Sequence, residues 1–65
     1  MDNEDRINIY SLEKIKEGLA DKRLYVVAEK TGVSYPTLKN LAEGNELNYT
    51  IDTLKAVTRY LQASN

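Results

Sequence analysis

The 65-residue sequence contains neither cysteine nor histidine. Without cysteine, no disulfide or thiolate metal site supports the fold. Zinc sites usually draw on the two missing residue types, and the usual proton shuttle near neutral pH is histidine. A chain this short also hardly encloses the pocket that a carboxylate acid/base pair needs. We therefore expect no enzyme, no metal site, no cofactor and no small-molecule ligand.

Long apolar runs are missing as well. No run approaches the ~20 residues that span a membrane. The N-terminus, Met1-Asp2-Asn3-Glu4-Asp5, is acidic and polar, unlike a signal peptide. We therefore expect a soluble, cytoplasmic protein with no membrane partner. Its length suits one domain over residues 6–65, preceded by a disordered polar tail at residues 1–5.

Charge is nearly balanced in total but not along the chain. The formal net charge is −1, whereas a nucleic-acid-binding domain is usually basic. Residues 22–42 contain four basic residues and one acidic residue, a net of +3, while residues 1–21 and 43–65 sum to −3 and −1. The field at a surface depends on local charge, so this segment favours an anionic partner. Four cations in such a segment also occur on an ordinary solvated surface.

Apolar residues at helical spacing predict two helices in the first half of the chain. The first follows Ser11, a good N-cap, and runs to about residue 20. Gly18 weakens it, which indicates close packing or an early end. The second covers about residues 23–30 and ends before Gly32, since glycine is favoured just beyond a helix.

Two further helices are predicted in the second half. Pro36 is tolerated only in a first turn, so the third helix covers about residues 35–43. Either Ser34 is its N-cap or Tyr35 is the last extended residue. The fourth begins after Tyr49 or Thr50 and carries its apolar stripe at Ile51, Leu54, Val57 and Leu61. The expected fold is mainly all-α, with four helices in one compact domain.

Two short segments alternate polar and apolar residues, as a half-buried strand does. They are residues 6–10 and residues 46–50. Because a lone strand is unstable, we predict that the two segments pair as a small sheet. The alternative is that Ile7 and Ile9 pack beneath the helices as an extended arm.

Residues 31–34, with the sequence Thr-Gly-Val-Ser, join the second and third helices. A turn of three or four residues that contains glycine is the connection of a helix-turn-helix unit. Gly32 supplies a positive φ, and Ala28 is small enough for two helices that cross closely. Val33 and Leu38 then fill the wedge between the helices, and Leu38 and Leu41 anchor the second of them.

This pattern resembles the Cro/cI-type helix-turn-helix family of phage repressors and their bacterial relatives, the lambda-repressor-like domains. The resemblance covers residues 12–61 in outline and residues 24–44 without a gap. Its matching residues are Val27, Ala28, Gly32, Val33, Ser34, Thr37, Leu38, Leu41, Gly44, residues 51–55, Val57 and Leu61. It implies a transcriptional regulator that binds double-stranded DNA with helix 35–43 in the major groove, as a homodimer on a pseudo-palindromic site. The family commonly has glutamine at the start of the second helix, where this chain has Leu24, and that departure leaves one phosphate contact unassigned.

With Leu38 and Leu41 facing inward, five residues of the third helix face outward as candidate base readers: Tyr35, Pro36, Thr37, Lys39 and Asn40. A carboxamide such as that of Asn40 pairs with adenine through two hydrogen bonds, and Lys39 reaches guanine or a phosphate. Tyr35 and Pro36 offer apolar surface to a thymine methyl. The alternatives are an ordinary solvated face for Asn40 and Lys39, and a hydrophobic cap on the turn for Tyr35.

Five residues are candidate phosphate contacts: Lys22, Arg23, Ser34, Thr37 and Asn45. The alternative for the cations among them is that they serve solubility alone. A second function stays open, that of a protein-binding module on the same fold, such as an antitoxin-like or inhibitory partner. The acidic balance, Leu24 and the tyrosines favour that alternative.

Overall fold

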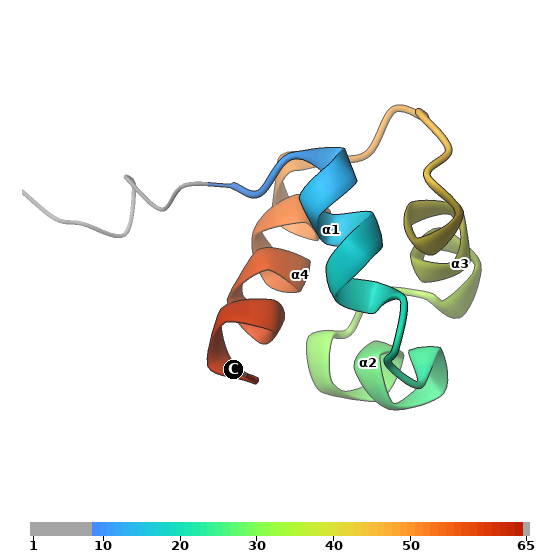
Figure 1. The fold of residues 1–65 in the computed structure, drawn as a ribbon. Coiled ribbons are helices and arrows are strands. Elements are labelled where there is room, and N and C mark those ends of the chain that lie inside the picture. Colours follow the sequence, from blue (N-terminus) through green and yellow to red (C-terminus); the bar gives the residue numbers. More distant parts are fainter. Residues whose placement is uncertain (1–8, 65) are drawn as a thin grey trace, which may run out of the picture.

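The computed structural model describes residues 9–64, where four helices follow one another (Figure 1). They are α1 (Leu12–Leu19), α2 (Leu24–Thr31), α3 (Tyr35–Glu43) and α4 (Ile51–Ala63). Helices α1 and α2 each contact both α3 and α4. The predicted all-α fold of four helices is confirmed. The tail predicted for residues 1–5 lies outside the described residues, and within them no helix is long and apolar enough to cross a membrane.

Three helices begin at a hydroxyl side chain that caps the first turn. Ser11, Ser34 and Thr50 each accept a hydrogen bond from the backbone N–H three residues later. Such a cap satisfies one of the N–H groups that the start of a helix leaves unpaired. The two alternatives of the sequence are thereby decided: Ser34, not Tyr35, is the N-cap of α3, and Thr50, not Tyr49, is that of α4.

The core consists of one side chain or more from each helix and one from the turn between α2 and α3. Its buried apolar residues are Ile15, Leu19, Val27, Val33, Leu38, Leu41, Val57 and Leu61. The stripe predicted for α4 is wrong at its first residue, since Ile51 is 57% exposed. The buried residues of α4 begin at its middle residue, Val57, and continue with Thr58 and Leu61. They include Thr58, a polar residue whose hydroxyl accepts the Tyr10 N–H at 3.1 Å.

The predicted sheet is not formed in the described residues, 9–64. Residues 46–50 form an irregular loop there, and residues 6–8 of the other expected strand lie outside the described range. Leu47 is 54% exposed, so the alternation at residues 46–50 does not bury one face. The Tyr49 N–H donates to the Leu47 carbonyl at 3.0 Å, a bond that bends the chain. Tyr10 donates its N–H to α4 instead of to a strand.

Helices α1 and α4 approach each other closely at Gly18. A β-carbon at this position would lie 2.8 Å from Cδ1 of Leu61. The close packing predicted from the glycine is confirmed.

Candidate nucleic-acid interface

The turn between α2 and α3 is held by hydrogen bonds on both sides of Gly32. This glycine has φ 80° and ψ 4°, and its N–H donates to the Ala28 carbonyl at 2.9 Å. The Thr31 hydroxyl donates to the Val27 carbonyl at 2.7 Å and accepts the Val33 N–H at 3.1 Å. Val33 is 9% exposed and points into the core. These contacts therefore fix the orientation of α3 relative to α2.

The outward side of α3 carries the five predicted base readers. Leu38 and Leu41 are buried, as predicted for the inward anchors. Two of the five candidates are exposed and three are half-buried: Pro36 and Lys39, then Tyr35, Thr37 and Asn40. The five do not form a single group, because four of them contact other side chains: Tyr35, Thr37, Lys39 and Asn40.

Tyr35 stacks on Tyr25, a contact that the sequence analysis missed. The two ring centroids are 4.5 Å apart and the ring planes differ by 12°. Tyr25 lies in the first turn of α2, so the stack joins the starts of α2 and α3. One face of the Tyr35 ring is therefore covered by a side chain of α2. The side chain of Tyr25 is 73% exposed. Nothing in the ten-residue spacing of the two tyrosines indicates this pairing.

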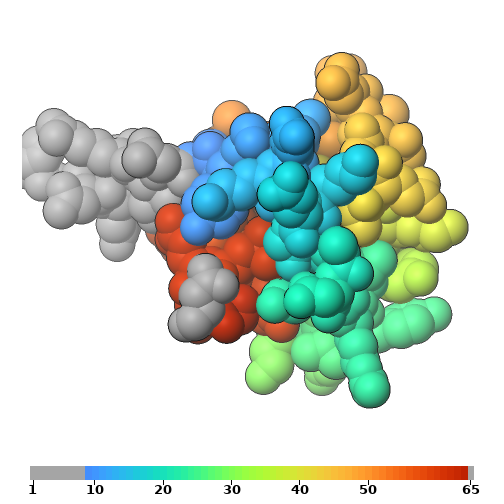
Figure 2. Space-filling view, in the orientation of Figure 1, coloured from blue at the N-terminus to red at the C-terminus, as the bar shows by residue number. Residues whose placement is uncertain are grey.

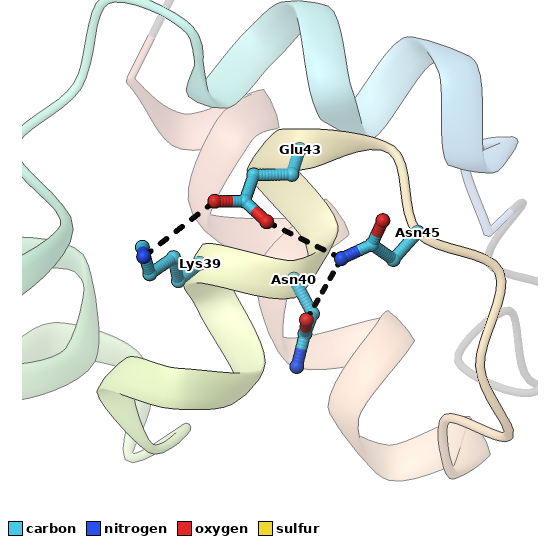
Figure 3. Close-up of polar contacts among 4 residues, drawn as sticks. All are labelled: Lys39, Asn40, Glu43 and Asn45. Atoms are coloured by element: carbon cyan, nitrogen blue, oxygen red, sulfur yellow. Dashed lines mark hydrogen bonds and ion pairs between the residues drawn. The ribbon is translucent and has the colours of Figure 1, made fainter.

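Asn40 and Lys39 belong to one polar network at the end of α3 (Figure 3). Nδ2 of Asn45 donates to Oδ1 of Asn40 at 2.9 Å and to Oε1 of Glu43 at 3.3 Å. The other carboxylate oxygen of Glu43 lies 3.6 Å from Nζ of Lys39. The sequence analysis missed Glu43, although its spacing of four residues from Lys39 is typical of a helical ion pair.

The predicted phosphate contacts lie in two places. Arg23 is the exposed N-cap of α2; its side chain makes no cap, and its backbone carbonyl accepts the N–H groups of Val26 and Val27 at 3.0 and 3.1 Å. Lys22 lies beside it, with Nζ 3.9 Å from Asp21. At the start of α3, the Ser34 hydroxyl donates to the Thr37 hydroxyl at 2.9 Å. Arg23 and Ser34 thus mark the starts of two helices that the tyrosine stack brings together.

Asn45 is held more firmly than a free phosphate ligand. Its N–H donates to the Asn40 carbonyl at 3.0 Å, and its own carbonyl accepts the Tyr49 hydroxyl at 2.6 Å. Desolvation by burial raises the pKa of Tyr49 above its ordinary value. The phenol therefore stays a neutral donor over a wide range of pH. Asn45 is fixed at backbone and side chain alike.

The positive charge of the interface is smaller than that of its sequence segment. Both cations that form ion pairs here, Lys22 and Lys39, face carboxylates outside residues 22–42: Asp21 and Glu43. Lys39, Glu43 and Asp21 are exposed and Lys22 is half-buried, so each pair lies at the surface and contributes little stability. Arg23 and Lys30 have no ion pair within residues 9–64.

Two shallow grooves lie on either side of Thr37 and Thr53. One, of about 210 Å³, runs between α3 and the loop after it and has no charged residue in its lining: Thr37, Asn40, Leu47, Asn48, Tyr49, Thr50 and Thr53. The other, of about 310 Å³, borders the turn and α4. Within the described part of the chain, no group of three His, Cys, Asp or Glu residues is placed to hold a metal ion.

No protein-family model, characterised protein or solved structure matches this chain.

Proposed function

We propose that this chain binds double-stranded DNA, with α3 in the major groove, and that it regulates transcription. The observation that carries the proposal is the α2–turn–α3 unit. Gly32 adopts a positive φ, Val33 fills the wedge, and α3 keeps an outward polar face. Two helices joined by a short glycine turn, with the second placed in the groove, are the geometry of helix-turn-helix proteins.

The starts of α2 and α3 support a phosphate-binding role in this proposal. A helix N-terminus attracts anions through its unpaired N–H groups and its dipole. The tyrosine stack brings the two starts to one side of the molecule, and Arg23 lies exposed at the first of them. One such unit reads a half-site, so we propose that two copies bind a two-fold symmetric site.

The test is a titration of DNA duplexes with the protein at several salt concentrations, in which fluorescence anisotropy measures binding. We expect Arg23→Ala to weaken binding to every duplex alike and to reduce the log–log salt slope by about one unit. Arg59→Ala removes the same charge from an exposed position of α4 and is the matched control; it should leave the slope unchanged. Absence of duplex binding at low salt by the folded protein would refute the proposal.

A second candidate function is recognition of another protein. The observation in its favour is the exposed apolar surface of α2, where Tyr25 is 73% and Val26 is 40% exposed. Side chains of α2 project from the lower edge of the molecule in Figure 2. Aromatic residues are enriched at protein interfaces. A folded protein that binds no DNA duplex in the titration above would favour this function.

A further inference from the structure

The side chain of Asn40 is held in one orientation by Asn45. Two hydrogen bonds join the same pair of residues, one between their backbones at 3.0 Å and one between their side chains at 2.9 Å. Gly44, with φ 81°, turns the chain so that Asn45 returns toward α3. Tyr49 then fixes the Asn45 carbonyl at 2.6 Å. Asn45 is therefore a preformed support rather than a loose loop residue.

The orientation decides which end of the Asn40 amide is free. Figure 3 shows Oδ1 of Asn40 turned toward Asn45 and Nδ2 turned away from it. Nδ2 of Asn40 has no hydrogen-bond partner within the described residues. Asn40 thus offers two N–H donors, while one of the two lone pairs of its acceptor Oδ1 is already engaged by Asn45.

This asymmetry has a consequence for base recognition. A two-bond pair with adenine needs a donor for N7 and an acceptor for the N6 amino group, on the same side of the amide. Guanine presents two neighbouring acceptors in the major groove, N7 and O6. One amino nitrogen with two hydrogens donates to both guanine acceptors, whereas a pair with adenine has to share Oδ1 with Asn45.

We propose that Asn45 is a positioning residue that makes Asn40 select guanine over adenine. The inference rests on the proposed DNA binding. It differs from the sequence analysis in two respects, since Asn45 was expected to contact phosphate and Asn40 to pair with adenine. Glu43 has a separate part, because it holds Asn45 through one oxygen and the Lys39 ammonium group through the other.

The experiment first obtains the preferred duplex by selection from random sequences. Each position of that site is then changed to all four base pairs and measured with the wild type, Asn40→Ala, Asn45→Ala and Glu43→Gln. The position at which Asn40→Ala no longer discriminates among the four base pairs holds the base that Asn40 contacts. We expect guanine there, and 7-deazaguanine at that position should weaken wild-type binding because it lacks the N7 acceptor.

Asn45→Ala should move the guanine-to-adenine affinity ratio at this position toward adenine, on the order of tenfold, since one base contact has that worth. Binding to scrambled duplexes should stay the same. Glu43→Gln is the control variant: it keeps an oxygen for Asn45 but releases Lys39. It should leave the ratio unchanged and strengthen binding to scrambled duplexes.

Three results would overturn the inference. They are a wild-type preference for adenine at the Asn40 position, insensitivity to 7-deazaguanine, or an unchanged ratio in a folded Asn45→Ala variant. Once Asn40→Ala has located the position, the analogue measurement uses the wild-type protein alone, so it decides even if Asn45→Ala is unfolded. Binding to scrambled duplexes separates the two proposals. If the protein binds them in a salt-dependent way but shows no preference for guanine, only this inference is refuted. If the protein does not bind them, the proposed DNA binding is refuted as well.

Discussion

Substitution of Gly32 tests whether the turn between α2 and α3 depends on a left-handed backbone alone. The residue has φ 80°, and a β-carbon added there would meet no atom within 4 Å. A β-carbon at this position therefore costs no packing energy. We expect the loss of stability on Gly32→Ala to come from the backbone conformation.

The magnitude follows from two opposing terms. A left-handed conformation costs a residue with a β-carbon about 1–2 kcal/mol. Replacing glycine by alanine returns about 0.4–1 kcal/mol, because the unfolded chain loses fewer conformations on folding. We expect Gly32→Ala to destabilise the fold by about 1 kcal/mol, and Gly32→Val by about 1–3 kcal/mol, since a β-branched residue is more strained at positive φ. Asparagine tolerates this region, so Gly32→Asn should lie closest to the wild type.

The assay is thermal and urea unfolding followed by circular dichroism. For a domain of this size, 1 kcal/mol lowers Tm by about 4–8 °C. The expected order of stability is glycine, asparagine, alanine, valine. Alanine as stable as glycine would refute the assignment of the cost to the backbone, and so would asparagine as unstable as valine.

Three further substitutions probe contacts of the described structure. Thr58→Val leaves the Tyr10 N–H without its acceptor and should cost about 1–3 kcal/mol in urea unfolding; Thr58→Ser, which keeps the hydroxyl, should cost less. Burial raises the pKa of Tyr49, so the stability it contributes is complete below about pH 10 and is lost as the pH rises through the raised pKa. Tyr49→Phe should therefore reduce the alkaline loss of stability, measured by urea unfolding at about pH 8 and about pH 11; an unchanged loss would contradict this. Gly18→Ala should lower Tm in the wild type, because overpacking against Leu61 at 2.8 Å outweighs a helix gain of about 1 kcal/mol, but raise it in a Leu61→Ala background.

The sequence predicted the helices because their ends are determined by neighbouring residues. A serine or threonine cap accepts the N–H three residues later, and Gly32, the residue that follows α2, ends that helix with its positive φ. The same local reasoning placed Leu38 and Leu41 inward. The outward face of α3 followed from their spacing.

The candidate site was predicted as a list of residues but not as an arrangement. Asn40 and Asn45 were both named, yet their mutual bond depends on the return of the chain at Gly44. The stack of Tyr25 on Tyr35 joins two helices, and no spacing within either helix indicates it. In the folded chain, each of these side chains contacts a partner from another segment, and that contact alters the role expected from the sequence.

Tertiary structure also decided which apolar patterns are buried. The alternation at residues 46–50 is compatible with a strand, but a strand needs a partner at hydrogen-bonding distance, and Tyr10 is bound to α4. Ile51 fits the stripe of α4 yet lies exposed, whereas polar Thr58 is buried. Helix ends follow from hydrogen bonds between residues three or four positions apart, which the sequence specifies directly. Burial follows from contacts between segments far apart in the chain, and their relative position exists only in the folded protein.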